Sequence, residues 1–186
     1  MKILIHGGFF SESSQSDETK QKKQSALKDI ILKGHSYLLN HSALETVIYT
    51  ASLLEDCPWF NAGIGSQIQG DGKIRMSASI MDGRNAKFSG VINIQKVKNP
   101  VFVAEKLLQE DDRVLSGEGA KQYANSQGFD SFSTETKERR EEYNLKLNTI
   151  KTGTVGCIAM DKNGHLAAAT STGGKGFEIP GRVSDS

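Results

Sequence analysis

The stretch Lys151-Thr152-Gly153-Thr154-Val155-Gly156 joins two unlike parts of this 186-residue chain. A polar, charged segment precedes it, and an apolar hairpin begins directly after it. Thr154 therefore presents a hydroxyl at the start of a strand, and Gly153 has no Cβ, so its carbonyl can adopt a strained geometry and be approached closely. Self-cleavage by attack of the Thr154 hydroxyl on the Gly153 carbonyl needs both features. A threonine that merely begins a strand is the other interpretation.

Cleavage at this bond would also create a catalytic base. The α-amine released on Thr154 has an ordinary pKa of about 7.7–8.0, so it can accept a proton near neutral pH. Nucleophile and base would then belong to one residue. The stretch is therefore a candidate for a threonine hydrolase that activates itself.

The charged segment before this stretch is interpreted as a linker. Residues 128–151 are mostly polar and include Lys137-Glu138-Arg139-Arg140-Glu141-Glu142, consecutive charges of mixed sign. Because few apolar residues accompany these charges, we favour a partly mobile linker over about 130–153. A solvated helix face is the alternative.

Outside these segments, hydrophobic periodicity and turn residues predict a sheet covered by helices. Ser42-Ala43-Leu44-Glu45 has the form of a capping box, in which a hydroxyl and a carboxylate each satisfy a backbone N–H at a helix start. Asn99-Pro100 marks another helix start, with Pro at the first position. The expected strands are 2–6 (buried), 73–81, 87–94, one near 114, 155–160 and 165–170, and the expected helices are 27–38, from 42 to about 54, 99–108 and 118–126.

Composition argues against several classes of protein. Lys plus Arg number 23 and Asp plus Glu 22, so the net charge of +1 gives no global field toward nucleic acid or anionic lipid. No segment approaches the roughly 18 apolar residues of a membrane span, and the N-terminal apolar run is too short for a signal peptide. We therefore expect a cytoplasmic protein in which Cys57 and Cys157 are free thiols.

The wider sequence resembles one known family. Residues 153–161 (Gly-Thr-Val-Gly-Cys-Ile-Ala-Met-Asp) and 164–174 (Gly-His-Leu-Ala-Ala-Ala-Thr-Ser-Thr-Gly-Gly) closely resemble the plant-type L-asparaginases, also called isoaspartyl aminopeptidases or β-aspartyl peptidases. The likeness extends to 179–186, 53–65 and Ile5-His6-Gly7-Gly8. These proteins are N-terminal nucleophile (Ntn) hydrolases. The resemblance therefore implies an α+β fold of the αββα type, a four-layer sandwich with two sheets between helical layers.

The resemblance also assigns catalytic roles. Thr154 would be the nucleophile, freed by autocatalytic cleavage after Gly153. Thr172 would lie beside it and hydrogen-bond its hydroxyl or amine, with Thr170 supporting the same cluster. Asn61 would orient groups near the nucleophile. The plain alternatives are threonines at strand ends and an asparagine in a turn.

Arg182 and Asp185 are the expected substrate clamp. A free amino-acid headgroup offers a carboxylate, which a planar guanidinium binds in bidentate fashion, and an ammonium, which a carboxylate can balance. Two opposite charges three residues apart in a glycine-containing loop suit that task, and the resemblance points to the same pair. A surface ion pair is the alternative.

A sodium-binding loop from Leu54 to Ile64 is a further implication of the resemblance. Hard oxygen ligands suit a hard cation. The Na⁺ would be structural, and the chemistry itself would need no cofactor. His6 is interpreted as part of the first strand rather than as a ligand. The coordinating atoms would be the backbone carbonyl oxygens of Leu54, Glu55, Cys57, Phe60, Ala62 and Ile64.

By the same resemblance, residues 1–153 would form an α subunit part and 154–186 the start of a β subunit, and αβ units would assemble as a dimer. Only 32 residues follow Thr154, so we expect the C-terminal half of the sandwich to be missing from this chain. The two strands after Thr154 would then lack sheet partners and leave apolar faces open.

The expected function is hydrolysis of L-asparagine and of β-aspartyl (isoaspartyl) dipeptides, with release of L-aspartate. The partners would be this small substrate and the other subunits, not nucleic acid or a membrane. Two alternatives stay open. One is a truncated, non-catalytic or precursor-like member of the family. The other is a related threonine hydrolase, such as a glycosylasparaginase or an endopeptidase, of which the charge pair Arg182 and Asp185 argues against the endopeptidase.

Overall fold

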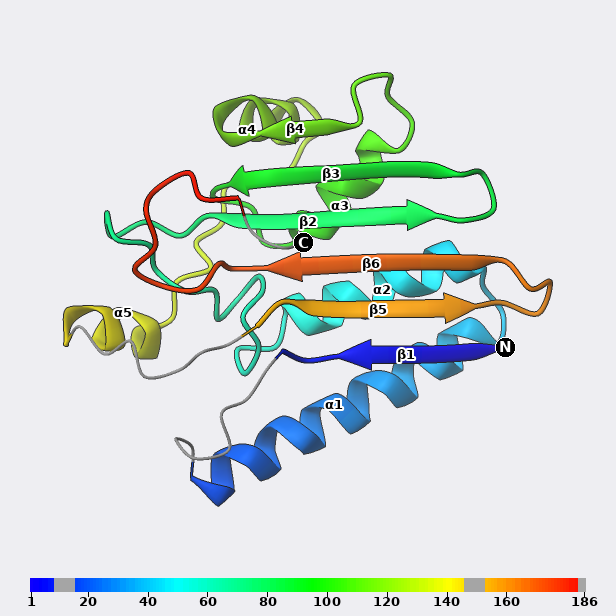
Figure 1. Ribbon diagram of the computed structural model, residues 1–186, viewed down its shortest axis with the longest axis horizontal. Coiled ribbons are helices and arrows are strands. Elements are labelled where there is room, and N and C mark those ends of the chain that lie inside the picture. The colour runs from blue at the N-terminus through cyan, green and yellow to red at the C-terminus, as the bar shows by residue number, and fades with distance from the viewer. Residues whose placement is uncertain (9–15, 146–152, 184–186) are drawn as a thin grey trace.

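The computed structural model describes residues 1–8, 16–145 and 153–183, and these form one mixed sheet with helices packed against it (Figure 1). Within these ranges the sheet has six strands in the order β1-β5-β6-β2-β3-β4, antiparallel except between β3 and β4. The strands are β1 (Lys2–His6), β2 (Met76–Asp82), β3 (Lys87–Ile94), β4 (Val114–Ser116), β5 (Val155–Met160) and β6 (Leu166–Thr172). The predicted α+β class is confirmed.

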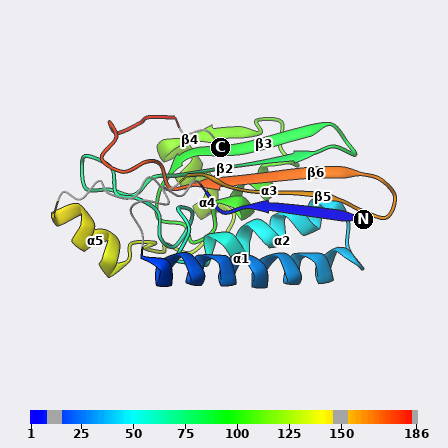
Figure 2. The same ribbon diagram turned by 60° about the horizontal axis from the view of Figure 1, so that its bottom comes forward.

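Four helices, α1 to α4, pack on one side of the sheet, whereas α5 lies beyond the ends of the strands (Figure 2). In Figure 2, α1 and α2 run along the same face, antiparallel to each other. Apolar side chains from these helices and from the covered sheet face form the main core, for example Val47, Ile80, Leu107 and Ala169. The helices of the described ranges are α1 (Asp17–Leu38), α2 (Ala43–Glu55), α3 (Pro100–Leu107), α4 (Gly117–Ser126) and α5 (Lys137–Asn144).

Local capping residues set the helix starts. The Ser42 hydroxyl accepts the Glu45 N–H at 3.2 Å, and the Glu45 carboxylate accepts the Ser42 N–H at 2.9 Å, so the predicted capping box is confirmed. Helix α1 begins ten residues before the expected position, because Ser16 caps it and the acidic Asp17 and Glu18 occupy its first turn.

The start of α3 differs from the expected cap. Pro100 is the first helical residue, as predicted, but the Asn99 side chain makes no cap hydrogen bond. Its amide instead donates to the Asp56 carboxylate at 3.0 Å and to the Ser52 carbonyl at 3.4 Å. Asn99 therefore ties the start of α3 to the end of α2.

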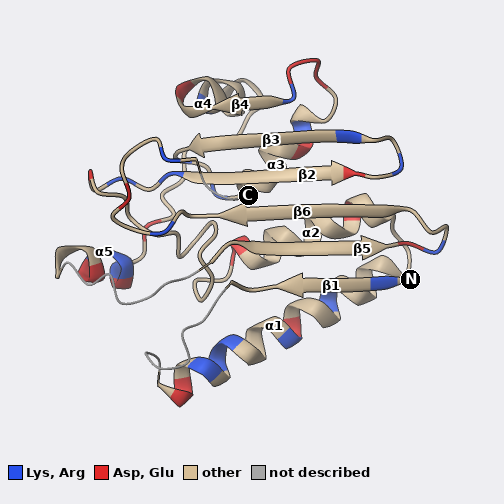
Figure 3. Cartoon of the chain, viewed as in Figure 1, with Lys and Arg blue, Asp and Glu red and all other residues tan. Residues whose placement is uncertain are grey.

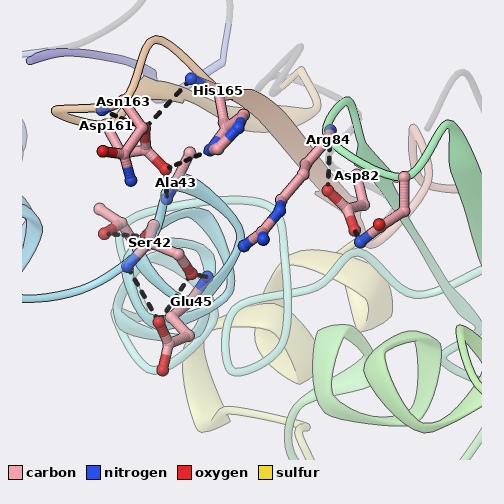
Figure 4. Close-up of polar contacts among 10 residues, drawn as sticks. Ser42, Ala43, Glu45, Asp82, Arg84, Asp161, Asn163 and His165 are labelled. Atoms are coloured by element: carbon pink, nitrogen blue, oxygen red, sulfur yellow. Dashed lines mark hydrogen bonds and ion pairs between the residues drawn. The ribbon is translucent and has the colours of Figure 1, made fainter.

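Asp161 joins the β5–β6 turn to the start of α2 (Figure 4). Its carboxylate accepts the N–H groups of Asn163 at 2.9 Å, His165 at 3.1 Å and Ala43 at 3.3 Å. Burial alone would raise the pKa of Asp161, but these backbone donors hold it below its ordinary value. One carboxylate thus fixes both the hairpin turn and its position on α2.

The run of charges from Lys137 forms helix α5, so the helical alternative holds for this part of the segment interpreted as a linker. Thr136 caps the helix by accepting the Arg139 N–H at 3.2 Å. Arg139 itself is buried and donates from Nε to the Gly65 carbonyl at 2.9 Å. A mobile linker was expected because few apolar residues accompany these charges. Polar contacts of Arg139, and not an apolar face, hold α5 against the rest of the protein. Residues 146–152 lie outside the described residues.

The edge position of β1 and the pairing of the last two strands both differ from expectation. Within the described ranges, strand β1 pairs only with β5 and leaves Lys2, Leu4 and His6 exposed, so it is not a buried strand. Strand β5 lies between β1 and β6, and β6 pairs with β2. Both strands after Thr154 therefore have partners on each side, because segments from the first half of the chain flank them.

The second face of the sheet is open and apolar. The strand registers align Leu4, Ile158, Ala168, Met81 and Phe88 in one row across five strands. The four large side chains of this row are 41–61% exposed. Figure 3 shows that the central parts of these strands carry no charged residues. The predicted open apolar face is therefore present, although its strands are paired.

None of the helices in the described parts of the chain combines the length and the apolar character needed to span a bilayer. The two cysteines are free thiols, as predicted, with Cys157 buried and Cys57 half-buried.

Candidate active site

The candidate residues gather at the end of the sheet where β5 begins and β6 ends. His6, the last residue of β1, pairs with Gly156, and Ser77 of β2 pairs with Thr172. The opposite end of the sheet holds the hairpin turns and the start of α2. Residues from distant parts of the sequence therefore meet at one strand-end region.

Thr154 and Thr172 face each other across two neighbouring strands. Val155 pairs with Ser171, and continuing this antiparallel register by one residue brings Thr154 opposite Thr172. Thr172 is buried, and its hydroxyl accepts the Gly174 N–H at 3.3 Å. The structure thus brings together the predicted nucleophile and its predicted hydroxyl neighbour.

Thr170 lies two residues before Thr172 on β6, on the same face of the sheet. Its hydroxyl is 2.8 Å from that of Ser79 on β2, within hydrogen-bonding distance. The sequence gives no sign of the contact between Ser79 and Thr170, because it does not reveal that β2 and β6 are neighbours in the sheet. By the strand register, Thr170, Thr172 and Thr154 therefore lie on the same side of the sheet, with Thr172 buried.

The bond between Gly153 and Thr154 lies against the turn that follows β1. His6 Nδ1 lies 2.9 Å from the Thr154 carbonyl oxygen, and it donates a hydrogen bond when Nδ1 carries the ring proton. Gly8 has φ +95°, and a Cβ there would lie 2.7 Å from the Gly153 carbonyl oxygen. The sequence gives no sign of this contact, because 145 residues separate Gly8 from Gly153.

A cavity of about 290 Å³ opens beside Thr154 on the uncovered sheet face. Gly156 and Ala168 leave room there because their side chains are absent or small. Its wall is mostly apolar, with the Thr154 and Thr170 side chains and His6 as the polar groups. The residues around it are Leu4, His6, Thr154, Val155, Gly156, Cys157, Ile158, Ala168, Ala169 and Thr170.

Asn61 connects the loop after α2 to the turn after β6. It is buried, and its side-chain amide donates to the Gly174 carbonyl while its side-chain oxygen accepts the Gln67 N–H at 3.0 Å. The Asn61 carbonyl also accepts the Gly173 N–H at 2.8 Å. Asn61 therefore holds the turn that directly follows Thr172, in line with its predicted place near the nucleophile.

The predicted ion loop folds back on itself. The Glu55 carbonyl accepts the Ile64 N–H at 2.7 Å, and the Cys57 carbonyl accepts the Phe60 N–H at 3.2 Å. Gly63 and Gly65 have positive φ, and a Cβ at Gly63 would lie 2.3 Å from the Glu55 carbonyl oxygen. A carbonyl oxygen has two lone pairs, so these two carbonyls retain acceptor capacity for a cation.

The ion loop is suited to a cation bound by backbone oxygens. In the described residues, no three His, Cys, Asp or Glu side chains gather closely enough to hold a metal ion. Tight glycine turns bring several carbonyls close together, which is the donor type that Na⁺ prefers. The loop therefore fits the kind of ion that the resemblance implies.

The Glu55 side chain has a structural role that no pattern in the sequence indicates. It is fully buried, and its Oε1 accepts the Ser171 hydroxyl at 2.7 Å and the Val101 N–H at 3.1 Å. Among the residues that the structure describes, Oε2 has no hydrogen-bond partner. Burial raises the pKa of Glu55 to about 8, despite these donors. Glu55 joins α2, α3 and the residue before Thr172, so it fixes the end of β6 within the core.

Arg182 lies in a turn near the same end of the sheet. Its N–H donates to the Ile179 carbonyl at 3.1 Å, and the neighbouring Gly181 carbonyl accepts the Asn93 side-chain amide at 3.1 Å. Asn93 belongs to the end of β3, two strands away from β6. Asp185, its predicted partner in the clamp, lies outside the described residues.

These features define an α+β protein with a threonine-lined candidate active site at one end of a sheet. Comparison with protein families then gives the particular family. The family model described as asparaginase matches residues 1–149 and 133–186. The chain therefore belongs to the asparaginase family, which confirms the resemblance found in the sequence.

Individual relatives agree with this assignment. The chain is 40% identical to "Isoaspartyl peptidase/L-asparaginase" of a Nostoc species, over 100% of this chain and 64% of the relative. It is 39% identical to the Synechocystis protein of the same name, over 100% of this chain and 61% of the relative. It is 34% identical to "Plant-type L-asparaginase" of Pyrobaculum calidifontis, over 99% of this chain and 66% of the relative. The chain thus spans somewhat less than two thirds of the Nostoc and Synechocystis relatives.

Proposed function

We propose that this chain carries the nucleophile of a hydrolase that cleaves L-asparagine and β-aspartyl (isoaspartyl) dipeptides and releases L-aspartate. The β5–β6 register, which brings Thr154 opposite Thr172, is the observation that carries the proposal. Relatives named isoaspartyl peptidase/L-asparaginase support the substrate class.

The first step is self-cleavage. The Thr154 hydroxyl oxygen attacks the Gly153 carbonyl carbon, the C–N bond between the two residues breaks, and the nitrogen takes up the proton. Water then hydrolyses the resulting ester, leaving a carboxylate on Gly153 and a free amine on Thr154. The contact of the Gly8 turn with the Gly153 carbonyl supports this step, because it restricts the geometry of the bond to be cut.

The second step is hydrolysis of the substrate. The free amine of Thr154 accepts the hydroxyl proton while the hydroxyl oxygen attacks the side-chain amide carbonyl of the substrate. Ammonia or an amino acid leaves, and water releases aspartate from the covalent ester. Thr172 hydrogen-bonds the nucleophile, and Asn61 keeps the adjoining turn in place; the buried position of both residues supports these roles.

Substrate recognition is assigned to Arg182 and Asp185. The guanidinium binds the α-carboxylate of the aspartyl headgroup, and the carboxylate of Asp185 balances its ammonium. The bond between Asn93 and Gly181, which holds the turn before Arg182 near the strand ends, supports this assignment.

A structural Na⁺ in the Leu54–Ile64 loop belongs to the same proposal. It would stabilise the loop that carries Asn61, without taking part in the reaction. We expect the melting temperature to be higher in Na⁺ than in choline at equal ionic strength, because binding to the folded state alone stabilises it. Equal melting temperatures would argue against the ion.

The proposed fold is an αββα sandwich. The proposed assembly is a dimer of αβ units in the cytoplasm. The open apolar sheet face supports the sandwich, since a second sheet packed there would bury the exposed row of large side chains. The division at Gly153 into an α part and a β part follows from the proposed cleavage.

Intact mass analysis of the purified chain tests the chemistry directly. Wild-type protein should convert to two fragments that meet between Gly153 and Thr154, whereas Thr154→Ala should stay whole and Thr154→Ser should be cut. A wild-type chain that remains whole after long incubation would overturn self-cleavage and favour a non-catalytic member of the family.

Substrate assays separate the remaining alternatives. Cleaved protein should release ammonia from L-asparagine and aspartate from β-aspartyl dipeptides, and Arg182→Ala should raise KM by a factor on the order of 10–100, the loss of a charge-assisted pair. Activity on glycosylasparagine alone would identify a glycosylasparaginase instead.

A further inference from the structure

A buried acidic side chain, Glu178, lies in the segment that follows β6, and the reaction proposed above gives it no role. Glu178 is 3% exposed. Figure 1 shows this segment, in red, beside the loop that precedes β2. The Phe177 N–H donates to the Ile68 carbonyl at 3.0 Å, and the Gly70 N–H donates to the Glu178 carbonyl at 3.0 Å. These backbone bonds hold the segment against the loop independently of the side chain at position 178.

The Glu178 carboxyl group folds back onto its own segment. Its Oε1 accepts the Lys175 N–H at 3.2 Å and the Gln69 side-chain amide at 3.3 Å. The same oxygen lies against Gly174, which has φ +80°, and a Cβ on Gly174 would collide with it. Among the described residues, Oε2 has no hydrogen-bond partner. All the polar contacts of this side chain in the described residues are therefore made by one oxygen, which acts as an acceptor.

The Gln69 side chain is itself fixed by a chain of polar groups. Its Oε1 accepts the Arg75 Nη1 at 2.6 Å, and Arg75 in turn pairs with the Asp71 carboxylate at 2.9 Å. The hydrogen bond with Asp71 raises the pKa of Arg75, burial lowers it, and the charges of Asp71 and Glu178 raise it further. Each member of the chain orients the next one. The Glu178 side chain is therefore anchored to the loop before β2.

Gly174 connects Glu178 to the candidate active site. Its N–H donates to the Thr172 hydroxyl at 3.3 Å, and its carbonyl accepts the Asn61 side-chain amide. The Glu178 carboxyl group occupies the side on which any other residue would carry its Cβ. Glycine has the greatest backbone freedom of all residues, so a glycine in a turn is held in place by its surroundings. Here Thr172, Asn61 and Glu178 together provide those surroundings.

The bond from the Gly174 N–H determines how the Thr172 hydroxyl can act. A hydroxyl has one hydrogen to donate and two lone pairs that accept. The Gly174 N–H uses a lone pair, so the hydroxyl hydrogen points to an acceptor other than this turn. The β5–β6 register brings Thr154 opposite Thr172. A fixed Gly174 therefore presents Thr172 to Thr154 as a hydrogen-bond donor.

We propose that Glu178 is a positioning residue, which keeps the Gly174 N–H on the Thr172 hydroxyl so that the Thr172 proton faces Thr154. This inference rests on the proposed function and adds to it a residue that acts only through the turn. Because Oε1 acts as an acceptor of N–H groups, the reach of the side chain matters and its charge does not. An amide oxygen at the same place can replace it, whereas a shorter carboxylate cannot.

Amide hydrogen exchange in the full chain, followed by NMR, tests the turn without any assay of activity. Glu178→Ala and Glu178→Asp should speed up exchange at the Gly174 amide by a factor on the order of 10, the contribution of one hydrogen bond. Glu178→Gln should leave it near the wild-type rate. Each rate is compared with that of the Ile80 amide in the buried centre of β2, so that local loosening is separated from a loss of overall stability.

Steady-state kinetics with L-asparagine, corrected for the cleaved fraction, test the effect on the reaction. Glu178→Ala and Glu178→Asp should lower kcat on the order of 10–100-fold and leave KM within about twofold. KM should hold because the turn before Arg182 is kept in place separately, by the Asn93 amide on the Gly181 carbonyl. Glu178→Gln should retain most of the activity. Glu141→Ala, at a 60% exposed side chain on α5, is the matched control and should behave as wild type.

The order of the variants decides between positioning and a plain counter-charge for Arg75. If Glu178→Ala does not fold, Glu178→Asp and Glu178→Gln still decide. A wild-type-like Glu178→Asp beside an impaired Glu178→Gln overturns the proposal, as does unchanged Gly174 exchange in Glu178→Asp, or a raised KM with an unchanged kcat. A wild-type protein without activity on either substrate class counts against the function proposed for Thr154, and Gly174 exchange then decides alone whether Glu178 fixes the turn.

Discussion

Gly8 is the residue whose replacement bears most directly on the Gly153–Thr154 bond. An alanine there would place its Cβ 2.7 Å from the Gly153 carbonyl oxygen, so the carbonyl must shift. Displacement of a reacting group by about 1 Å can slow a reaction on the order of 100-fold. Gly8→Ala should therefore slow self-cleavage by about that factor, as followed by intact mass against time.

Gly164→Ala is the matched control. Gly164 also has positive φ, but a Cβ there would meet nothing within 4 Å. The control should share the backbone strain of Gly8→Ala and still be cut at the wild-type rate. Wild-type cleavage in Gly8→Ala would show that the turn does not constrain the bond.

The Ser171 hydroxyl and the Val101 N–H both donate to Oε1 of the buried Glu55 carboxyl. Ser171→Ala should lower the free energy of unfolding by about 1–3 kcal/mol, because a buried acceptor loses a partner. Urea unfolding measures this change. Ser36→Ala, at an exposed position of α1, should stay within about 0.5 kcal/mol of wild type. A comparable loss in both variants would contradict the assigned role.

At the scale of elements, Asp161 connects the β5–β6 hairpin to α2. Asp161→Asn should lower the free energy of unfolding at neutral pH by about 1–2 kcal/mol, because charge-assisted bonds to three backbone N–H groups become neutral ones. Urea unfolding of both proteins measures this difference. Asp112→Asn, exposed after α3, serves as the control and should have little effect.

The pH dependence of this difference has a defined sign. The folded-state pKa of Asp161 lies below its ordinary value of about 3.9. Its contribution is therefore fully present above that ordinary value and is lost as the pH falls through the folded-state pKa. The gap between wild type and Asp161→Asn should shrink in acid, and a gap that widens there would contradict the assignment.

At the scale of the whole molecule, the open sheet face should bind apolar probes. The chain should enhance the fluorescence of anilinonaphthalene sulfonate, since Leu4 and Ile158 are 61% and 50% exposed in one continuous row. The double variant Leu4→Lys with Ile158→Glu should lose most of this signal and stay folded, because the two charges attract across the strands.

Leu32→Lys provides the comparison for this prediction. Leu32 is 60% exposed on α1, away from the sheet face, so its replacement should leave dye binding nearly unchanged. Equal dye binding by the wild type and the double variant would show that the dye binds elsewhere.

The local structure follows from the order of the amino acids, because caps, turns and periodicity act between near neighbours. The Ser42–Glu45 capping box, strand Lys87–Ile94 and the first residues of α3 follow directly from such patterns. The resemblance carried by residues 153–174 also identified the family. The start of α1 was missed, since Ser16 follows a stretch without apolar periodicity.

The contacts between distant residues become known only once the chain is folded. Insertion of β5 between β1 and β6 brings His6 to the Thr154 carbonyl and gives both late strands their partners. Burial of Arg139 turns a charged run into an ordered helix against the Gly65 carbonyl. These contacts depend on strand order and on packing between segments far apart in the chain, which no local pattern of residues encodes.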